Sequence, residues 1–582
     1  MNLTKQQRAA AESEGNAYVE ACPGSGKTRV LISKALREIR KASESPRRVA
    51  CITFTNAAVD EMEHRLRSFS SEDEASHVDV GTIHSFCLSQ IFKPFRCRLP
   101  EYADGFEIVS GDDERAQELF RQLASKRRIT PKPYQLDQVG QIGIDLSGNP
   151  MAADQEQWVG ECMREYWDEF RRRGWIDFSL LLFESLEILR KFPEIQESLG
   201  ARYRCILVDE FQDTTALQLE ILSRIQSTGA STFFLVGDPH QSIYGFAGAS
   251  PAASSRFVEA IGARSDYPLS GNFRSSARIV DVADNLLPRS PTMKAVGKWA
   301  HAPCDVRSYI TTDVANAVVD RFLTSAMELE LDLGECAVLA AWWTDLLVIA
   351  RTCVRRGIAV VGPGARPYKR GRLIVPLLEH LAAVAAEKGS LRSTQRALQR
   401  CANEMEGLDR SRVDGWNGRL ISLELHHAAM DAAARISSPL DWIMAVGERI
   451  DRILSEREVG SSSSFKMSAQ DVVADIYANE KQGRVHVESM TVASLGLFAD
   501  PTKALKLMTV HASKGREFDA VAVVHMNEGR FPHFTAKTTD QISEGRRVAY
   551  VGTTRARRLL HLIVDSADRR DTPSRFIRDM GI

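Results

Sequence analysis

Short apolar runs alternate with amphipathic stretches along most of the chain, and this alternation predicts parallel strands connected by helices. Short apolar runs bounded by turns are typical of buried strands, whereas apolar positions three and four residues apart are typical of helices with one buried face. Helical patterns such as Asn56–Phe69 and Ala216–Ile225 lie between the strand-like runs. This order favours doubly wound α/β layers. The predicted strands are Ala17–Ala21, Val49–Phe54, Cys205–Val208, Phe233–Val236, Ala337–Ala340, Ala520–His525 and Leu559–Val564.

Two long blocks depart from this alternation. Residues 88–175 and 374–495 carry many charged positions at helical spacing and few strand-like runs. We therefore predict two α/β domains, each interrupted by a mostly helical insertion. The run Gly460–Ser464 inside the second block predicts a mobile loop. The predicted boundaries are 1–87 and 176–270 for the first α/β domain, 88–175 for its insertion, 271–373 and 496–582 for the second α/β domain, and 374–495 for its insertion.

The composition is that of a globular protein. Of the 582 residues, 44% are apolar and 26% are charged, which excludes a fibrous or wholly disordered chain. The 75 basic and 76 acidic residues nearly cancel, so a polyanion would have to bind in a local groove. The start has no apolar signal region and no run reaches the length of a membrane helix, so we expect a cytoplasmic protein with no membrane partner. The ten cysteines include no C-x-x-C pair, which disfavours a cysteine-based metal site and predicts buried, reduced thiols.

The segment A-C-P-G-S-G-K-T, residues 21–28, has the context of a phosphate-binding loop, because it lies between a predicted strand and a helical pattern. Gly24 and Gly26 would let backbone N–H groups approach phosphate oxygens. Lys27 is predicted to reach the β- and γ-phosphates of ATP, and Thr28 to bind Mg²⁺. Ala21 stands where such loops usually have their first glycine. The residues predicted to bind the nucleotide here are Ala21, Cys22, Pro23, Gly24, Ser25, Gly26, Lys27, Thr28 and Arg29.

Two carboxylates, Asp209 and Glu210, follow the predicted strand Cys205–Val208 directly. The carboxyl ends of strands are where α/β sheets bind ligands. We predict that Asp209 holds Mg²⁺ and that Glu210 is the general base for the attacking water. An acidic pair at a strand end is commonly only solvated, but the phosphate loop upstream favours the catalytic interpretation.

Further motifs follow in order and make the prediction more specific. They are LTKQQ at 3–7, TFTNAAVDEM at 53–62, GTIHSF at 81–86, VGDPHQSIYGF at 236–246, NFRSS at 272–276, TVHASKGREF at 509–518 and YVGTTRA at 550–556. With the phosphate loop and the acidic pair, this series resembles the UvrD/Rep/PcrA group of superfamily 1 DNA helicases over nearly the whole chain. The resemblance implies two RecA-like domains of the P-loop NTPase class with helical insertions, which hold ATP between them and single-stranded DNA across both.

The resemblance also implies roles for residues around the nucleoside of ATP. Gln7 matches the glutamine that reads the adenine edge, and Phe273 matches the aromatic residue that stacks on that base. Glu517 matches an acid near the ribose or the phosphates. Taken without the resemblance, Gln7 would be interpreted as an exposed helix residue.

Three further matches concern the γ-phosphate. Gln241 matches the glutamine that senses this phosphate and links it to the DNA site. Arg274 and Arg555 match the two arginines that reach it from the second domain. An arginine in that place spreads the charge of the transition state, and such residues are worth roughly 10³–10⁵ in rate elsewhere. An arginine considered alone is more often part of a surface ion pair.

Aromatic side chains are implied as the contacts to DNA. Stacking on a ring is worth about 1–3 kcal/mol per base and accepts any sequence. Burial in the core is the alternative for Phe54 and Tyr244. The residues that match DNA-contacting positions of the family are Phe54, His84, Tyr244, Phe246 and His511.

Three departures from the family pattern lie near these positions. Phe246 replaces the usual tryptophan, Ala247 stands where an arginine is frequent, and Ala57 stands where a lysine is frequent. The smaller ring and the two missing charges are expected to weaken the coupling between ATP and DNA.

The function predicted from these residues is an ATP-dependent DNA helicase that translocates 3′ to 5′ on single-stranded DNA, with ATP and Mg²⁺ as cofactors and a role in DNA repair. The polarity comes from the resemblance alone. Single-stranded DNA and DNA junctions are the expected partners, together with a possible nuclease or a repair or defence factor. The alternative is a DNA-stimulated ATPase that serves as motor or sensor subunit of a nuclease or phage-defence complex.

One charged stretch is independent of the resemblance. Seven basic residues and no acid lie between Asp345 and Glu379. Such a stretch is a candidate phosphate-contacting surface, and a solvated helix face is an equal alternative. The seven are Arg351, Arg355, Arg356, Arg366, Lys369, Arg370 and Arg372.

Overall fold

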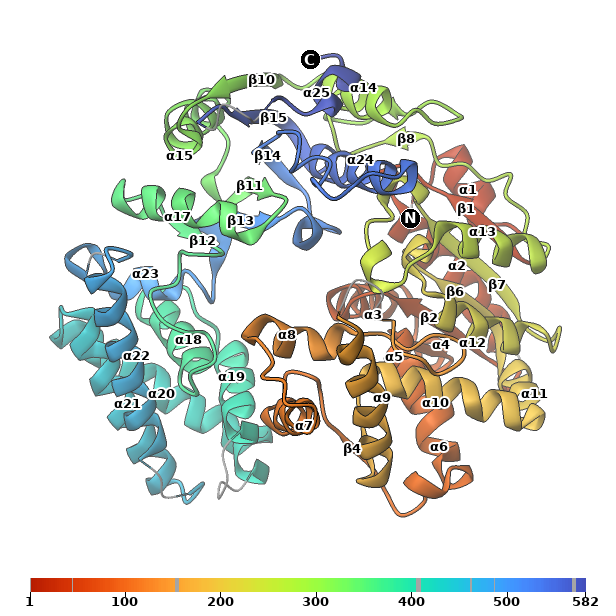
Figure 1. The fold of residues 1–582 in the computed structure, drawn as a ribbon, viewed down its shortest axis with the longest axis horizontal. Coiled ribbons are helices and arrows are strands. Elements are labelled where there is room, and N and C mark those ends of the chain that lie inside the picture. The colour runs from red at the N-terminus through yellow and green to blue at the C-terminus, as the bar shows by residue number, and fades with distance from the viewer. Residues whose placement is uncertain are drawn as a thin grey trace. The chain divides into compact units, whose positions relative to one another are not determined.

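The computed structural model describes residues 2–43, 45–151, 156–404, 410–460, 463–485, 487–567 and 572–582. The chain forms two compact units (Figure 1). Unit 1 comprises Met1–Arg274 and Arg289–Gly297, and unit 2 comprises Ser275–Pro288 and Lys298–Ile582. The chain therefore leaves unit 1 after Arg274, returns to it at Arg289, and leaves it again after Gly297.

Unit 1 is built on a five-stranded sheet in the order β1-β7-β6-β2-β3, in which every neighbouring pair is parallel. Apolar clusters cover both faces of the sheet, which explains why its inner strands read as continuous apolar runs. The four strands predicted in this region are confirmed. Strand β3 was missed because Asp79 and Gly81 interrupt its apolar positions. The bounds are β1 Ala17–Glu20, β2 Arg48–Thr53, β3 Val78–Thr82, β6 Tyr203–Val208 and β7 Thr232–Gly237.

Several helices around this sheet begin at side chains that cap their first turns. Thr55 accepts a hydrogen bond from the Ala58 N–H at the start of α3, and Thr215 forms a capping box with Gln218 at the start of α12. Both predicted helices are confirmed. The helices are α1 Lys5–Ala11, α2 Lys27–Ala42, α3 Asn56–Phe69, α4 Glu72–Ser76, α5 Ile83–Phe86, α10 Phe178–Lys191, α11 Pro193–Arg202, α12 Ala216–Gln226 and α13 Pro251–Ala260.

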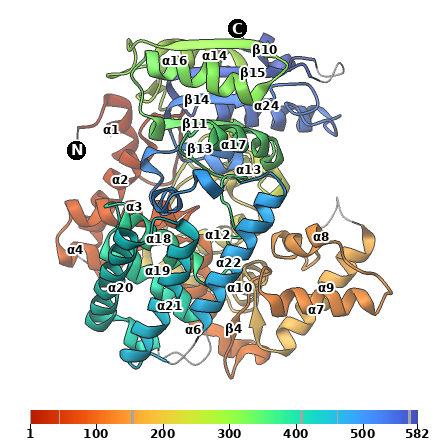
Figure 2. The same cartoon turned by 90° about the vertical axis from the view of Figure 1, so that its left-hand side faces the viewer.

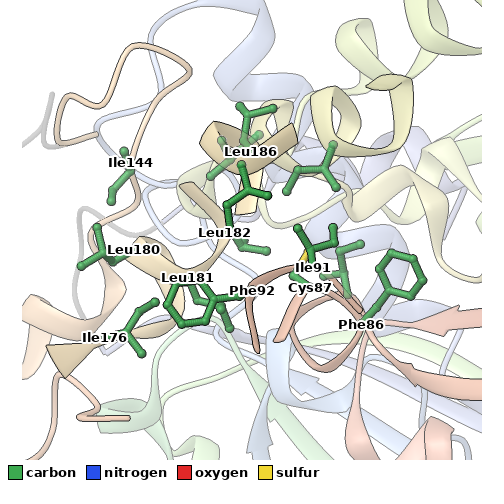
Figure 3. Packing of buried hydrophobic residues seen from close by; sticks show 14 of the residues in the cluster. Phe86, Cys87, Ile91, Phe92, Ile144, Ile176, Leu180, Leu181, Leu182 and Leu186 are labelled. Carbon is green, nitrogen blue, oxygen red and sulfur yellow. The ribbon is translucent and has the colours of Figure 1, made fainter. Parts of the chain in front are cut away.

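The first insertion is mainly helical, as predicted. Its core continues the apolar layer on one face of the sheet, since Trp167 of the insertion belongs to the same buried cluster as Ile206 of β6. Figure 3 shows part of this cluster, with Phe92 beside Leu181 of α10. The insertion is thus anchored to the sheet by buried side chains. Its elements are α6 Lys93–Phe95, α7 Glu114–Ser125, α8 Pro133–Gln138, α9 Gln157–Arg172 and the paired strands β4 Glu107–Ile108 and β5 Trp175–Ile176.

Unit 2 is built on a six-stranded sheet in the order β10-β15-β14-β11-β13-β12, and all its neighbouring pairs are parallel. The three strands predicted here are confirmed. Strand β10 was missed because it lies at an edge and mixes polar with apolar residues without a regular pattern, and β13 was missed because Lys506 interrupts it. The bounds are β10 Asp305–Thr311, β11 Cys336–Ala340, β12 Val360–Val361, β13 Leu505–Thr509, β14 Phe518–Val524 and β15 Ala556–Asp565.

The two parallel sheets confirm the predicted α/β class with two RecA-like domains and helical insertions. A short parallel pair, β8 Gly271–Asn272 with β9 Lys294–Ala295, ties the returning segment of unit 1 to the segment that precedes Arg274. The remaining helices of unit 2 outside its insertion are α14 Ala277–Leu286, α15 Val314–Ala317, α16 Leu323–Glu328, α17 Leu346–Arg355, α24 Thr539–Thr553 and α25 Arg575–Met580.

The second insertion is a helical bundle with its own core, which includes Trp442, Phe465 and Leu381. Figure 2 shows α20, α21 and α22 side by side. Of the predicted loop Gly460–Ser464, residues 461 and 462 lie outside the described residues, and Ser464 already belongs to α22. The helices are α18 Val375–Ala385, α19 Leu391–Glu404, α20 Gly415–Arg435, α21 Pro439–Glu456, α22 Ser464–Lys481 and α23 Val492–Gly496.

The basic stretch before this bundle is partly neutralised by carboxylates. Arg366 bonds to Glu379 at 2.7 Å, and Arg372 bonds to Asp475 at 3.0 Å. For these two arginines the structural alternative is therefore favoured over phosphate contact. Eight of the ten cysteines are buried, as predicted, and Cys97 and Cys304 are exposed. No helix among the described residues is long and apolar enough to cross a membrane.

Candidate active site

The phosphate loop joins β1 to α2 and owes its shape to two glycines. Gly24 has φ +66° and Gly26 has φ +81°, a region of backbone space that other residues rarely adopt. A Cβ at Gly24 would lie 2.5 Å from Cβ of Arg274, and one at Gly26 would lie 2.8 Å from Nε2 of Gln7. Both positions therefore require glycine for conformation and for space.

The start of the loop is fixed to the sheet. The N–H of Ala21 donates to the carbonyl of Gly237, and the N–H of Cys22 donates to the carbonyl of Leu269, each at 2.9 Å. Ala21 is not among the residues with positive φ, so alanine replaces the usual glycine without backbone strain. Arg29, by contrast, is exposed on the first turn of α2.

Gln7 and Phe273, both matched to the adenine site, lie beside this loop. The Nε2 of Gln7 donates to the carbonyl of Ser25 at 2.8 Å, and its Oε1 accepts from the N–H of Thr4 at 3.0 Å. Gln7 is therefore a buried residue rather than an exposed helix residue. The N–H of Phe273 donates to the carbonyl of Gly24 at 2.8 Å, and its ring is 37% exposed.

Lys27 and the acidic pair meet at the carboxyl edge of the sheet. The Nζ of Lys27 lies 3.1 Å from Oε2 of Glu210. Burial alone would lower the pKa of Lys27, but the carboxylates of Glu210, Asp238 and Asp209 outweigh it and raise this pKa. Glu210 adopts φ +47°, a costly conformation for a residue with a side chain and one that is common at functional sites.

The two oxygen ligands predicted for Mg²⁺ fit that ion chemically. Asp209 directly follows β6, and Thr28 is the second residue of α2. Burial, followed by the negative charge of Glu210, raises the pKa of Asp209 to about 7. A divalent cation would relieve this repulsion, and Mg²⁺ commonly uses one or two protein oxygens together with substrate phosphates. A cage of three or more His, Cys, Asp or Glu side chains is not found among the described residues.

Gln241 belongs to a buried hydrogen-bond network that extends to Glu210. Its Nε2 donates to Oδ2 of Asp238 at 2.6 Å, and the other oxygen of Asp238 bonds to Arg289 at 2.8 Å. The Oε1 of Gln212 accepts from the N–H of Asp238 at 2.8 Å, while its Nε2 donates to Oε2 of Glu210 at 2.7 Å. Gln241, the predicted γ-phosphate sensor, is thus linked through Asp238 and Gln212 to Glu210, the predicted general base.

The remaining predicted residues are divided between the units. Arg274 is the last residue of unit 1 before the chain enters unit 2, whereas Arg555, Glu517 and His511 lie in unit 2. Arg555 is buried, and its Nε donates to the carbonyl of Val551 at 3.0 Å. Glu517 forms an ion pair with Arg557 at 2.7 Å. His511 follows β13 and is half-buried.

The aromatic residues matched to DNA contacts form a group on unit 1. The rings of Phe54 and Tyr244 stack with centroids 5.2 Å apart at 24°, and the ring of Phe246 lies 6.0 Å from that of Tyr244. Phe246 is 70% exposed and Phe54 is 40% exposed. The core alternative is therefore excluded for Phe54, whereas Tyr244 is partly buried.

A cavity of about 900 Å³ adjoins this group. Phe54, Tyr244 and His84 line it on the side of the sheet. Met151 and Phe178 line it from segments to which no role had been given, and the ring of Phe178 lies 5.6 Å from that of His84. Burial lowers the pKa of His84 and so favours its neutral form. Three predicted DNA residues thus share one mostly apolar hollow, whereas Phe246 is not among the residues that line it.

Sequence reasoning missed three polar residues of the site. Asp238 and Gln212 belong to recognised motifs but received no role, although Asp238 directly follows an apolar strand as Asp209 does. Arg289 lies outside every motif and reaches the site only after the chain has passed through α14. No local pattern in the sequence could have indicated Arg289.

Comparison with known proteins agrees with this geometry. The sequence model of the UvrD/REP helicase N-terminal domain matches residues 3–261, and that of the UvrD-like helicase C-terminal domain matches residues 486–567. The chain is 25% identical to the ATP-dependent DNA helicase PcrA of Staphylococcus epidermidis and 26% identical to DNA helicase II of Haemophilus influenzae. Each alignment covers 99% of this chain and 86% of the relative.

Proposed function

The chain belongs to the UvrD/REP family of helicases, and we propose that it hydrolyses ATP to move 3′ to 5′ along single-stranded DNA and to separate duplex strands. The observation that carries this proposal is a continuous series of hydrogen bonds. Lys27 bonds to Glu210, which bonds to Gln212. Gln212 in turn bonds to Asp238, which accepts from Gln241. This series joins a phosphate loop to the segment that carries Tyr244 and Phe246. A DNA-coupled ATPase needs such a connection.

ATP would bind with its phosphates on the loop Ala21–Thr28. Lys27 would exchange its contact with Glu210 for the β- and γ-phosphates, because a phosphate offers more negative charge than one carboxylate. Glu210 would then be available to take the proton of the attacking water. Thr28 and Asp209 would hold Mg²⁺, which supplies positive charge to the phosphates when it is bound.

The residues beside the loop would recognise the rest of the nucleotide. The amide of Gln7 lies at the phosphate loop, which supports its proposed contact with adenine, and Phe273 offers a partly exposed ring for stacking. We further propose that Arg274 and Arg555 each donate to the γ-phosphate in the transition state. Glu517 is proposed to act near the ribose or phosphates; its pairing with Arg557 holds its carboxylate in a fixed direction.

DNA would be held through its bases rather than through a uniformly basic surface. Phe54, Tyr244 and Phe246 offer ring faces, and His84 lines the adjoining cavity. Such contacts tolerate any sequence, as a translocating motor requires. His511 of unit 2 is proposed as a further contact. We propose a cytoplasmic location, where single-stranded DNA, DNA junctions and a partner such as a nuclease or repair factor are accessible.

The proposal is tested by measuring ATP hydrolysis and strand separation together. The substrates are one duplex with a 3′ single-stranded tail and the same duplex with a 5′ tail. We expect ATP hydrolysis to rise with single-stranded DNA and only the 3′-tailed duplex to be unwound. Hydrolysis without unwinding of either duplex would favour the alternative of a motor or sensor subunit. No stimulation of hydrolysis by DNA would contradict both.

A further inference from the structure

The carboxylate of Asp238 is fully buried between two partners, one nearby in the sequence and one distant. One oxygen accepts from Gln241 at 2.6 Å, three residues later in the chain. The other oxygen accepts from the guanidinium of Arg289 at 2.8 Å. The side chain of Asp238 is 0% exposed and that of Arg289 is 5% exposed, so water does not compete for either group.

Arg289 keeps this carboxylate charged. Burial would raise the pKa of Asp238, but Arg289 and then Lys27 outweigh it and lower the pKa. A buried carboxylate without its cationic partner is strongly unfavourable, and it takes up a proton or turns away. The Asp238 carboxylate, which accepts the hydrogen bond from Gln241, therefore depends on Arg289 for its negative charge.

The same guanidinium nitrogen also contacts the residue just before Gln241. This nitrogen, NH2, bonds to Asp238 and lies 3.1 Å from Nδ1 of the His240 ring. The planar guanidinium is buried, so its orientation toward both side chains is restricted. A lysine would keep the positive charge but not this planar group.

Arg289 has an unusual place in the chain. It is the first residue of unit 1 after the excursion Ser275–Pro288, which contains α14 and belongs to unit 2. Its backbone therefore directly follows a segment of unit 2, while its side chain is buried in unit 1.

We propose that Arg289 is a positioning residue, which acts on ATP hydrolysis by holding Asp238 and thereby the amide of Gln241 toward the γ-phosphate. This inference rests on the proposed function, because it assigns Gln241 to that phosphate. Arg289 itself touches neither the nucleotide nor the reacting water. Its removal should therefore lower kcat while leaving the KM for ATP nearly unchanged.

A double-mutant cycle between Arg289 and Gln241 tests the proposal. We expect Arg289→Met to lower the kcat of DNA-stimulated ATP hydrolysis about 10-fold or more, with KM within about twofold of wild type. Gln241→Ala should lower kcat at least as much. The double variant should be no slower than Gln241→Ala within about threefold, because a residue that acts through Gln241 has nothing left to position.

A stability control separates positioning from loss of folding. Arg171→Met removes a guanidinium of the first insertion that bonds to the nearly buried carboxylate of Glu184 on α10 at 2.7 Å. It should lower the melting temperature and leave kcat at wild-type level. If Arg289→Met does not fold, Arg289→Lys takes its place in the cycle, since it keeps the charge and loses the forked geometry.

The outcomes are distinct. Losses that multiply in the double variant, or an Arg289 variant with kcat within about twofold of wild type, would overturn the positioning role. An Arg171→Met protein that loses kcat in proportion to its stability would also overturn the positioning role, because any loss of stability would then be enough to lower kcat. A wild-type protein that hydrolyses no ATP would contradict the proposed function together with this inference.

Discussion

At the scale of single residues, Glu210 has two contacts that define what it can do. Its Oε2 accepts from Lys27 at 3.1 Å and from Gln212 at 2.7 Å, and its backbone is held at positive φ. A carboxylate that is held by two donors and placed at the end of a strand can be re-used as a base once Lys27 turns to a phosphate. The strained backbone fixes the direction in which it points.

We expect Glu210→Gln to lower ATP turnover at least 100-fold, within the range of about 10²–10⁴ typical for loss of a general base. Glutamine keeps the shape and the contact to Lys27 but cannot take a proton. ATP affinity should stay within a few-fold of wild type, measured with a fluorescent ATP analogue. The control is Glu220→Gln on α12, whose carboxylate pairs only with Arg224 four residues away among the ion pairs described. Residual turnover above about a tenth of wild type would contradict the role of Glu210.

Phe246 offers a second residue-scale prediction, because it is 70% exposed and is not a core residue. We expect Phe246→Ala to weaken binding of single-stranded DNA roughly 5- to 150-fold, which corresponds to about 1–3 kcal/mol for one stacked base. Basal ATP turnover and melting temperature should stay unchanged, and the loss should not depend on base sequence. The measurements are fluorescence anisotropy with labelled oligonucleotides and calorimetry.

A matched control for that variant is Phe69→Ala. Phe69 ends α3 and is 50% exposed, but it lies away from the stacked pair of Phe54 and Tyr244 in sequence and does not line the adjoining cavity. Phe69→Ala should bind DNA as wild type does. Equal losses in both variants would mean that exposed apolar area, and not a stacking position, determines the binding.

The sequence alone was sufficient to predict the positions of residues that belong to one short motif. Lys27, Asp209 and Glu210 stand in motifs that end or begin an element, so their meeting at the edge of the sheet follows from the α/β layout. Arg289 could not be predicted, because its place depends on how the chain returns after α14. The exposure of Phe246 could not be predicted either, since an aromatic residue in a loop is compatible with both burial and solvent.

At the scale of elements, the phosphate loop depends on glycine for space as much as for backbone freedom. Gly24→Ala would place a Cβ 2.5 Å from that of Arg274, in addition to the strain of φ +66°. We expect ATP affinity, measured by calorimetric titration, to fall at least 10-fold. The reason is that the loop must open away from Arg274 and its N–H groups then no longer converge on phosphate.

Gly15→Ala is the control that isolates the strain. Gly15 has φ +73°, but nothing lies within 4 Å of the position of its Cβ. It should cost about 1 kcal/mol of stability, as alanine does at positive φ, and leave ATP binding unchanged. If Gly15→Ala impairs ATP binding as much as Gly24→Ala, then strain in unit 1 and not the clash at the loop is responsible.

Burial separates the most conspicuous predicted strands from β3 and β10, which were missed, whereas the mostly buried β13 was missed because Lys506 interrupts it. Strands β2, β6 and β7 are covered on both faces, so nearly every position is apolar and the run is conspicuous. Strands β3 and β10 lie at the edges of their sheets, and their sequences VDVGT and DVRSYIT mix polar with apolar residues. Pairing with a neighbour, rather than the sequence pattern, makes these segments strands.

At the scale of the whole molecule, each unit carries its own core and its own share of the predicted residues. The nucleotide loop, the acidic pair and the exposed aromatic residues belong to unit 1, whereas Arg555, Glu517 and His511 belong to unit 2. The stability of unit 2 therefore bears on the roles proposed for Arg555, Glu517 and His511. Its sheet contains a buried histidine that makes this stability depend on pH.

His561 of β15 is 1% exposed and bonds through Nε2 to Asp305 of β10 at 3.1 Å. The hydroxyl of Tyr309 lies 3.3 Å from its Nδ1, and Arg307 bonds to the same aspartate. Burial lowers the pKa of His561, and this effect outweighs the opposing effect of Asp305. Burial would raise the pKa of Asp305, but its bonds to His561 and Arg307 lower it overall.

These shifts fix the sign of a pH dependence. A histidine whose pKa is lower in the folded state stabilises the fold above its unfolded pKa of about 6.5, and this contribution is lost as the pH falls. The lowered pKa of Asp305 stabilises the fold above about pH 3.9, and this contribution is lost only as the pH falls below that value, outside the range between pH 7 and pH 5. We therefore expect the free energy of unfolding to fall between pH 7 and pH 5, and His561→Gln to make that fall shallower by at most about 1.4 kcal/mol per pH unit. Denaturant titrations of both proteins at pH 7, 6 and 5 measure the difference.

The control is His427→Gln on the exposed face of α20, which should leave the slope unchanged. A slope for His561→Gln equal to that of wild type would mean that His561 titrates alike in the folded and unfolded chains, and a steeper slope would reverse the assigned sign.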